Sequence, residues 1–335
     1  MLLRLGVACR VWAAAIAVTL ARIRRGPARP RWTWAHELIV TAMKREFARL
    51  APLAWPLQRR TWRAIALPSF AVRGARFKRT RLAGMEAEWI TPRDLPRDQQ
   101  AHEGTTLLYL HGGAYLFGTI DEYRDFASRI AREAHARALV VGYRLAPEHP
   151  FPAALDDAIA AYTALLDSGI PASRIVVAGD SAGGGLTASL LVALRDRGVT
   201  LPAGAVLVSP WVDLAARGGT LVAHEKHDFF TPQLVEHWAR TVLAGADETD
   251  PRASPARADL RGLPPLLVQV GGAEMILDQV AEFADRARTA GVDTRLRVWE
   301  DCFHDWPLFA AVLGDGRRAV EEIGAFVREV TNVHR

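Results

Sequence analysis

The sequence predicts an α/β fold, with a mostly parallel eight-stranded sheet covered by helices on both faces. From residue 75 onward, short apolar runs alternate with longer segments whose apolar residues recur at helical spacing. Most of the apolar runs are continuous rather than alternating, which is typical of parallel strands buried on both faces. The 335 residues, 50% of them hydrophobic, are enough for one large core.

The strand and helix signals follow one another along most of the chain. An antiparallel pair of strands is predicted at 75–82 and 86–91. Six further strands are predicted at 106–110, 138–142, 175–178, 205–208, 266–270 and 294–299. Helices between most of them are predicted at 123–134, 153–166, 184–197 and 276–290. We therefore expect a basic helical extension over residues 1–74 and one α/β domain over residues 75–335.

Basic charge is concentrated near the N-terminus. Residues 1–83 contain 18 Lys and Arg but only two acids, Glu37 and Glu46, whereas the remainder contains 24 basic and 35 acidic residues. Such a segment favours peripheral contact with anionic lipid, and a solvated basic face packed on an acidic body is the alternative. No nucleic-acid-binding pattern accompanies the charge, so nucleic acid is not expected as a partner.

Residues 11–21 form an apolar stretch between arginines. The stretch is shorter than the roughly 20 residues that span a bilayer, and no clean signal cleavage site follows it. We expect an amphipathic or buried helix here, with a secretory signal or membrane anchor as the alternative. Cys9 and Cys302 offer neither a disulfide framework nor zinc spacing, which indicates free thiols in a reducing cytoplasmic compartment.

A second N-terminal helix is predicted over residues 32–50. Its apolar residues fall on one side, which predicts a buried or docked face. They are Leu38, Ile39, Ala42, Met43, Phe47 and Leu50. Pro52, Pro56 and Pro68 are expected to end the helical pattern.

The stretch IVVAGDSAGGG, residues 175–185, carries the clearest chemical signal. An apolar strand runs into Gly-Asp-Ser-Ala-Gly and then into a helix, which is the context of a nucleophile elbow. The sharp turn strains the backbone at Ser181 and brings strand and helix so close that side chains at Gly179 and Gly183 would clash. The pattern predicts a nucleophilic Ser181, and a glycine-rich packing turn is the alternative.

A nucleophilic serine needs a base, and the base needs an orienting acid. Among the histidines after Ser181, His304 stands in a short loop directly after the last predicted strand. The acid is expected after strand 266–270, where the sequence offers Glu274 and Asp278. The residues alone leave both open, since either carboxylate could instead favour a helix N-terminus.

Five blocks in order resemble the hormone-sensitive lipase family of α/β-hydrolases over residues 106–306. They are HGGAY at 111–115, YRLAPEHPFPAALDD at 143–157, GDSAGGG at 179–185, DPRASPARADLRGLPPLLVQVG at 250–271 and FH at 303–304. The resemblance implies a serine carboxylester hydrolase that needs no cofactor or metal. It also implies a helical cap built from the N-terminal helices and from an insertion at about 213–258.

The resemblance assigns further site residues. The family places an Asp that opens a DPL-x-D motif about thirty residues before the histidine, and Glu274 occupies that place in this chain. It implies backbone donors for a developing oxyanion at Gly112, Gly113 and Ala182. A substrate pocket is expected around Tyr115, Leu116, Phe117, Asp180, Trp211 and Trp238. Within the insertion, a helix at 232–243 is expected to turn Leu234, Trp238 and Leu243 toward the site.

The substrate is expected to be a small hydrophobic ester with a short or medium acyl group. An amidase or arylacetamide deacetylase, a steryl acetate hydrolase and a non-catalytic ligand-binding member stay open as alternatives. Retention of His304 argues against the last, because binding-only relatives lack that histidine. The resemblance also implies a homodimer formed through the last strand and its neighbouring helix.

Overall fold

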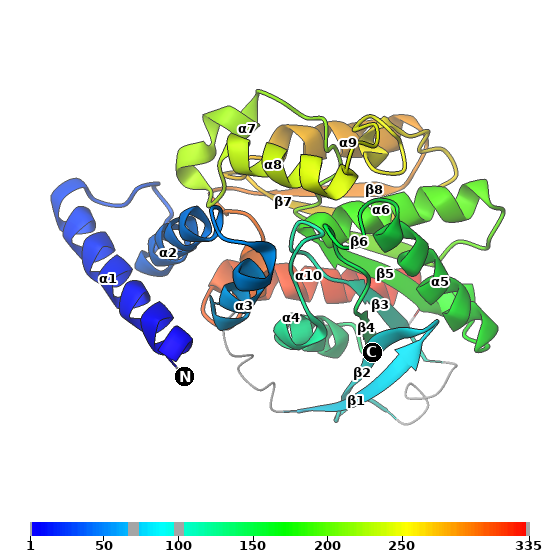
Figure 1. Cartoon of the computed structure of the whole chain (residues 1–335). Coiled ribbons are helices and arrows are strands. Elements are labelled where there is room, and N and C mark those ends of the chain that lie inside the picture. The colour runs from blue at the N-terminus through cyan, green and yellow to red at the C-terminus, as the bar shows by residue number, and fades with distance from the viewer. Residues whose placement is uncertain (1, 66–73, 97–103, 333–335) are drawn as a thin grey trace.

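One sheet of eight strands runs through the centre of the molecule (Figure 1). The computed structural model describes residues 2–65, 74–96 and 104–332. The strands are β1 (Ala75–Leu82), β2 (Met85–Pro92), β3 (Thr106–Leu110), β4 (Arg137–Val141), β5 (Ile175–Asp180), β6 (Gly204–Val208), β7 (Leu266–Gly271) and β8 (Thr294–Trp299). Their order in the sheet is β1-β2-β4-β3-β5-β6-β7-β8, which confirms the predicted fold class.

The parallel part of the sheet sets the positions of the loops that follow the strands. β2 is antiparallel to both of its neighbours, and all pairs from β4 to β8 are parallel. The last residues of β3 and β5, Leu110 and Gly179, lie in register. Asp180 pairs with Val208, and Gly271 pairs with Trp299. The loops after β3, β5, β6, β7 and β8 therefore all leave the sheet at the carboxyl ends of its parallel strands.

Helices cover both faces of the sheet, as predicted. The helices α4 (Ile120–Glu133) and α10 (Gly314–Val330) pack on the face formed by Tyr109, Val140 and Ala178. The opposite face receives α5 (Ala153–Asp167), α6 (Ser181–Asp196) and α9 (Leu277–Thr289). Because consecutive residues of a strand point to opposite faces, β3 alone supplies Leu108 to one core and Tyr109 to the other.

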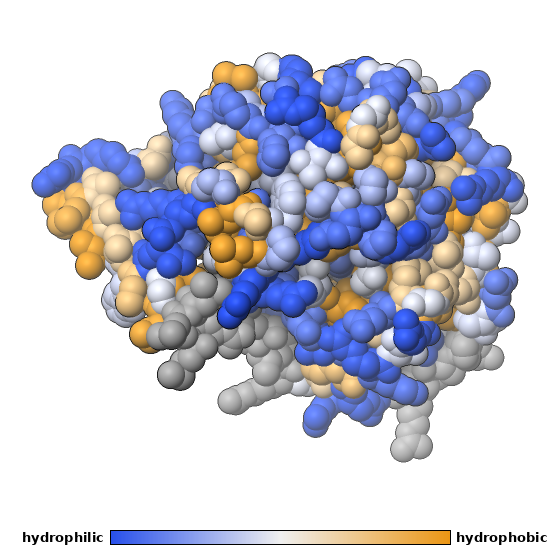
Figure 2. All heavy atoms as spheres, in the orientation of Figure 1, coloured by the Kyte–Doolittle hydropathy of each residue, from blue (hydrophilic) through white to orange (hydrophobic). Residues whose placement is uncertain are grey.

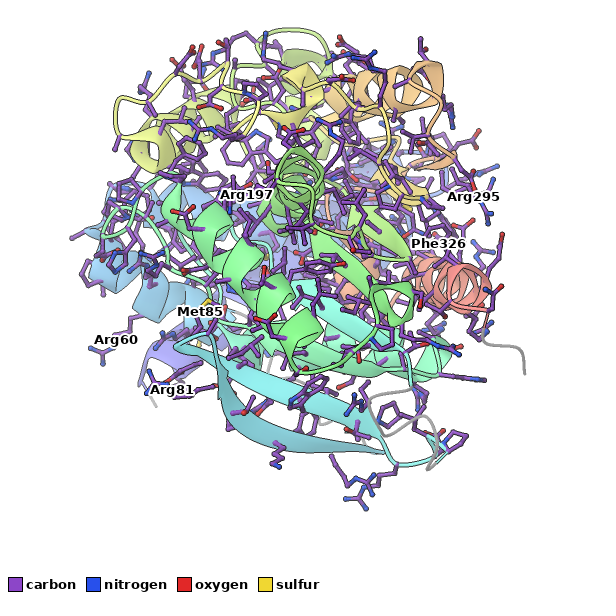
Figure 3. All side chains as sticks on the ribbon, turned by 90° about the vertical axis from the view of Figure 1, so that its right-hand side faces the viewer. Arg60, Arg81, Met85, Arg197, Arg295 and Phe326 are labelled. Atoms are coloured by element: carbon purple, nitrogen blue, oxygen red, sulfur yellow. The ribbon has the colours of Figure 1, made fainter. Side chains whose placement is uncertain are left out.

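The C-terminal helix α10 is the largest element that the sequence analysis did not name. Its Gly324 lies so close to α4 that an added Cβ would stand 2.5 Å from the carbonyl carbon of Glu133. At the outer side, the Arg295 guanidinium lies 5.5 Å from the ring centre of Phe326 and also pairs with Glu329 (Figure 3). These contacts hold α10 against α4 and against the edge strand β8.

Three helices precede the sheet: α1 (Leu2–Arg25), α2 (Trp34–Leu50) and α3 (Trp55–Ile65). They lie on the left in Figure 1, beside the insertion that follows β6. Arg10 and Arg22 of α1 form ion pairs with Glu46 and Glu37 of α2, and both carboxylates are buried. These buried pairs attach α1 to the rest of the molecule.

Two expectations for this segment were met only in part. The helix that contains the apolar stretch 11–21 is longer than that stretch, and its Leu5–Arg25 part is long and apolar enough to cross a membrane by length and composition. Only 22% of its most apolar window is buried. The prolines were expected to end the helical pattern; α2 does end at Leu50, just before Pro52, but α3 forms with Pro56 in its first turn, where a missing N–H costs no hydrogen bond. Pro68 lies outside the described residues.

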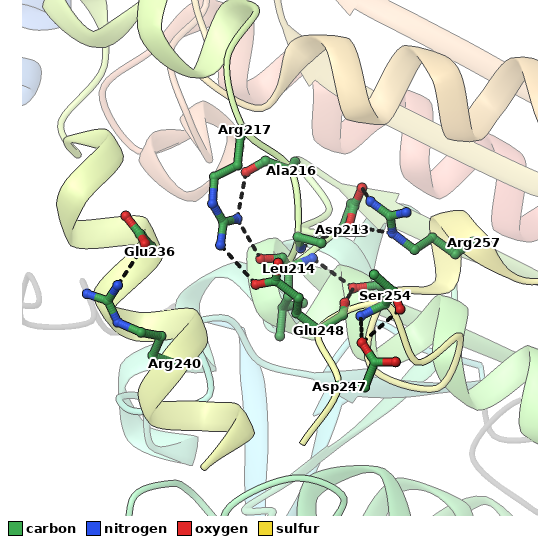
Figure 4. A network of polar contacts seen from close by, with 12 residues as sticks. Asp213, Leu214, Ala216, Arg217, Glu236, Arg240, Asp247, Glu248, Ser254 and Arg257 are labelled. Carbon is green, nitrogen blue, oxygen red and sulfur yellow. Dashed lines mark hydrogen bonds and ion pairs between the residues drawn. The ribbon is translucent and has the colours of Figure 1, made fainter. Parts of the chain in front are cut away.

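The insertion after β6 contains α7 (Thr220–Ala223) and α8 (Pro232–Leu243), the latter with the predicted bounds. Polar contacts fold its loops onto one another (Figure 4). Arg217 pairs with Glu248, and Arg257 pairs with Asp213. Ser254 accepts a hydrogen bond from the Leu214 N–H and donates one to the Glu248 carbonyl. We call the helices α1–α3 and residues 213–258 together the cap.

The contact between α10 and α4 generates a test of stability. Gly324→Ala should lower the free energy of unfolding by about 1–3 kcal/mol, because the new methyl group meets the backbone of Glu133. Helix propensity alone favours alanine by about 1 kcal/mol, so the sign of the change reports the clash. Thermal unfolding followed by circular dichroism measures it. Gly314→Ala on the same helix is the control, since its nearest neighbour is Arg317 Nη2 at 3.7 Å. Equal melting temperatures of the two variants would contradict the contact.

Candidate active site

Ser181 stands at the turn between β5 and α6. Its φ is +50°, a left-handed conformation that costs a non-glycine residue about 1–3 kcal/mol. An added Cβ at Gly179 would lie 2.3 Å from the Gly183 carbonyl oxygen, and one at Gly183 would lie 2.0 Å from the Leu110 carbonyl oxygen. The predicted strain and the predicted need for glycine on both sides are confirmed. The turn presents a half-buried Ser181 at the edge of the sheet where five loops meet.

A chain of hydrogen bonds joins Ser181, His304 and Glu274. His304 Nε2 lies 2.9 Å from Ser181 Oγ, and His304 Nδ1 lies 3.0 Å from Glu274 Oε2. Glu274 is fully buried and His304 is 3% exposed. Because the carboxylate can only accept, Nδ1 carries a proton and Nε2 is left to accept one from the serine.

Asp278, the other acid that the residues left open, lies elsewhere. Its Oδ2 accepts a hydrogen bond from the Thr220 N–H of the insertion at 2.7 Å. The helix α9 begins at Leu277, so Asp278 stands in its first turn, where a carboxylate is favoured by the helix dipole. The structure therefore brings Glu274, and not Asp278, to the histidine.

Ser209 holds the acid and was not singled out in the sequence. Its hydroxyl donates to Glu274 Oε1 at 2.7 Å and accepts the Asp305 N–H at 3.1 Å. The Gly271 N–H also donates to Glu274 Oε1. Burial raises the pKa of Glu274, and the histidine and Ser209 oppose that shift. The only signal available was the position of Ser209 directly after a predicted strand.

Two further buried carboxyl groups face His304. Asp305 Oδ2 lies 3.3 Å from His304 Nε2, on the same nitrogen that meets Ser181. Asp228 of the cap accepts the N–H groups of Phe229 and Met275 at 2.8 and 2.9 Å and also accepts the His304 backbone N–H. Asp228 therefore ties the insertion to the loops that carry both the acid and the histidine. Nothing in the sequence distinguished it from other acids of the insertion.

These carboxyl groups shift the pKa values around the histidine. Burial opposes the charged imidazole, but Asp305 and then Glu274 outweigh burial and raise the pKa of His304 to about 10. Burial also raises the pKa of Asp305 well above its ordinary value, against the attraction of His304. The two shifts depend on each other, because a protonated Asp305 no longer raises the pKa of His304.

The loop after β3 differs from its prediction at one donor. The Gly112 N–H is donated to Asp180 Oδ1 at 2.9 Å, so it is not available to an oxyanion. Gly113 and Ala114 line the same cavity as Ser181, and both have positive φ, at 108° and 54°. Ala182 is in the first turn of α6, where N–H groups lack helical partners. The candidate donors are thus Gly113, Ala114 and Ala182. Sequence reasoning overlooked Ala114 because a left-handed alanine is rarely expected.

Buried polar groups hold this loop in place. The Tyr109 hydroxyl donates to Asp180 Oδ1, which also receives Gly112. The ring of His111 stacks on Tyr143 with centres 4.3 Å apart, and the Tyr143 hydroxyl donates to the His111 carbonyl at 2.6 Å. Burial lowers the pKa of His111 to about 4, so this imidazole is neutral near pH 7. In the His-Gly-Gly stretch, His111 and Gly112 therefore hold the loop in place, and only Gly113 is a candidate donor.

A mostly apolar cavity of about 360 Å³ contains Ser181 and His304. Its aromatic wall comes from both parts of the cap and from the sheet loops. The residues of that wall are Phe47, Trp62, Phe117, Trp211, Phe229, Phe230 and Trp238. The stripe predicted on the second N-terminal helix supplies Leu38, Ile39, Ala42, Met43 and Phe47 to the same cavity.

Not all of the predicted pocket residues reach this cavity. Phe117, Trp211 and Trp238 do, but Leu116 is fully buried in the core and Tyr115 packs beside α6, next to Gly185. Asp180 lies beneath the loop, where its Oδ1 accepts hydrogen bonds from the Tyr109 hydroxyl and the Gly112 N–H. The turn at 113–115 causes the difference for Tyr115, because its positive φ values direct successive side chains to unexpected sides.

The insertion helix α8 also differs in part from its prediction. Trp238 faces the cavity as expected, but Val235 takes the place expected for Leu234, and Leu243 packs into the core. Val235 and Trp238 are three residues apart and so lie on one face of α8. The sequence pattern did not indicate which face of this helix lies toward the cavity.

Comparisons with known proteins agree with this geometry. A family model described as the alpha/beta hydrolase fold matches residues 107–308. An acetyl-hydrolase of Streptomyces hygroscopicus is 44% identical over 246 residues, which cover 73% of this chain and 80% of that protein. An esterase of Acinetobacter venetianus is 32% identical over 248 residues, with 73% and 80% covered.

Solved structures extend the likeness to three dimensions. A crystal structure of an esterase from the bacterial hormone-sensitive lipase family is 40% identical, covers 87% of this chain and 98% of its own, and superposes with a TM-score of 0.81. An identity of this size over most of both chains goes beyond a shared fold. The chain therefore belongs to the alpha/beta hydrolase fold family and, within it, to the bacterial hormone-sensitive lipase group.

Proposed function

We propose that the protein is a serine carboxylester hydrolase that works through an acyl-enzyme. The hydrogen-bond chain from Ser181 through His304 to Glu274, at the floor of an apolar cavity, is the observation that carries this function. The family to which the chain belongs is an ester-hydrolysing one, and relatives named esterase and acetyl-hydrolase support the assignment.

The first half of the reaction uses the tautomer that Glu274 imposes. Ser181 Oγ attacks the ester carbonyl carbon while His304 Nε2 takes the hydroxyl proton. Glu274 stabilises the imidazolium so formed. When the tetrahedral intermediate collapses, the carbon–oxygen bond to the alcohol breaks, and His304 returns the proton to the leaving alkoxide. An acyl group remains on Ser181.

Water completes the second half by the same route. His304 removes a proton from water as it attacks the acyl carbon, and it then returns a proton to Ser181 Oγ when the carboxylic acid leaves. In both halves, negative charge develops on the former carbonyl oxygen. We assign its donors to the N–H groups of Gly113, Ala114 and Ala182, and losing one such donor typically costs about 10²–10³-fold in rate.

The cavity supports a hydrophobic ester as substrate. Its aromatic wall offers few polar partners, and its volume of about 360 Å³ favours acyl groups of short to medium length. The Streptomyces relative is named an acetyl-hydrolase, which supports a short acyl group. Amide hydrolysis by the same machinery stays the second candidate, since nothing in the three side chains separates an alcohol from an amine as leaving group.

Self-association through β8 is the proposed mode of assembly. This strand is at the edge of the sheet, where it pairs with β7, and its Val298 is 47% exposed. An edge with unpaired backbone groups can pair with a second copy of the chain. Sedimentation velocity of the full chain tests for the dimer.

Hydrolysis of a series of p-nitrophenyl esters from acetate to palmitate tests the proposed function. We expect turnover to be highest for the short and medium acyl chains, because a cavity of about 360 Å³ has little room for longer ones. A fluorophosphonate probe should label the wild-type chain at Ser181 and fail to label Ser181→Ala. Inertness toward every ester, or labelling elsewhere, would contradict the function, and faster cleavage of matched anilides would favour the amidase.

Glu274→Gln and Asp278→Asn form a matched pair that tests the acid. The glutamine can keep its oxygen toward Ser209, which turns its amide N–H toward His304 Nδ1 and forces the wrong tautomer. We expect kcat to fall by about 10⁴-fold in this variant. Asp278→Asn should stay within about twofold of wild type, because Asp278 contacts Thr220 of the insertion. The reverse pattern would overturn the assignment.

Asp305→Asn tests whether the Asp305 carboxylate raises the pKa of His304. Activity requires a neutral His304, so the acidic limb of the profile of kcat/KM against pH reports its pKa. An ionised Asp305 raises that pKa, and removing the carboxylate should move the limb to lower pH by about one unit. The profile of Asp278→Asn serves as the control. An unmoved limb would show that Asp305 is already protonated and does not charge the imidazole.

A further inference from the structure

The helix α1 presents an apolar stripe to solvent. Leu5, Trp12, Ile16, Leu20 and Ile23 follow one another at spacings of seven, four, four and three residues, so they lie on one face. Their exposed fractions run from 50% to 76%. Among the eleven large hydrophobic residues that are exposed in the described part of the chain, these five share one helix, and Figure 2 shows the stripe along the left edge of the molecule.

The opposite face of α1 packs against the rest of the protein. Val7, Ala14 and Val18 are buried, and the ion pairs of Arg10 and Arg22 with α2 fix the rotation of the helix about its axis. The stripe cannot turn inward without breaking these pairs. It is therefore a lasting outer face of the folded protein.

The helix α1 contains basic residues and no acid. The only two acids of residues 1–83, Glu37 and Glu46, are buried and paired with arginines. Arg24 and Arg25 are exposed in the last turn of α1, whereas the exposed Arg31 beyond it is paired with Glu300. An apolar face with a cationic rim is complementary to a bilayer surface that carries anionic headgroups.

We propose that α1 docks in the plane of an anionic bilayer through this stripe. A membrane-spanning arrangement would break the buried ion pairs and carry Arg10 into the hydrocarbon. A second copy of the chain is disfavoured, because two stripes would bring two cationic rims together.

Docking there also places the cavity beside the membrane. Val7 and Val11, on the inner side of α1, line the cavity that contains Ser181. A hydrophobic ester dissolved in the bilayer therefore enters next to the docked helix. This part of the inference rests on the proposed function, whereas the docking itself does not.

Flotation of the full chain with vesicles tests the docking. Wild type should float with vesicles of equal parts phosphatidylcholine and phosphatidylglycerol, and the triple variant Trp12→Ser, Ile16→Ser, Ile23→Ser should bind at least about tenfold more weakly. Val222→Ser, an exposed apolar residue of α7, is the matched control and should bind as wild type does. Equal binding by the triple variant and wild type, or no binding by wild type, would overturn the proposal.

Three further experiments test the role of the basic residues, whether α1 lies in or spans the bilayer, and whether the stripe instead forms a dimer. Arg24→Gln should weaken binding by about fivefold at low salt, and vesicles of phosphatidylcholine alone should bind less. Alkaline carbonate should release the protein, because an in-plane helix is peripheral; retention would show a span and overturn the proposal. A stripe buried in a dimer would appear as a dimer by sedimentation that the triple variant abolishes, and this too would overturn it.

Hydrolysis separates docking from catalysis. The triple variant should keep the wild-type rate on soluble p-nitrophenyl acetate, since none of its three residues lines the cavity. On p-nitrophenyl palmitate carried in vesicles, wild type should be faster with anionic than with neutral vesicles, and the triple variant should lose that difference. Equal wild-type rates on the two vesicles would overturn delivery from the bilayer, while a chain inactive on acetate would instead count against the proposed function.

Discussion

The rest of the structure depends on the close approach of α6 to the end of β3. The Gly183 backbone lies so near the carbonyl oxygens of Leu110 and His111 that no side chain fits between them. This contact makes the turn at Ser181 sharp and brings the loop after β3 beside it. Ser181 and the candidate oxyanion donors are thereby held together by backbone packing, which is more rigid than a contact between flexible side chains.

Buried carboxyl groups then connect the site to the cap. Glu274, Asp228 and Asp305 surround His304 in a region shielded from water, where an unpaired charge is costly. Each carboxyl group is held by backbone or hydroxyl donors or faces the imidazole itself. Because Asp228 belongs to the insertion, a displaced cap would also disturb the histidine loop and the acid loop. Asp228 thus connects the position of the insertion, which lines the cavity, with the positions of Glu274 and His304.

The N-terminal helices have two roles that follow from their amphipathic pattern. Their inner faces complete the cavity, with Phe47 in contact with aromatic residues of the insertion. Their outer side leaves the stripe of α1 uncovered. The helix α1 lines the cavity on one side and faces solvent on the other, so the proposed membrane contact would reach the cavity without a long-range conformational change.

The sequence by itself determined the strands of the sheet, the helices between most of them, the turn at Ser181 and the loop of His304, because periodicity and glycine spacing are local properties of the chain. It did not indicate α3 or α10. It left the choice between Glu274 and Asp278 to a family resemblance. Only the tertiary structure decided that the Gly112 N–H binds Asp180, that Ala114 lines the cavity as a candidate donor, and that Ser209, Asp228 and Asp305 lie around Glu274 and His304. These roles depend on where loops from different strands meet, and a backbone with positive φ directs side chains in ways that no linear pattern encodes.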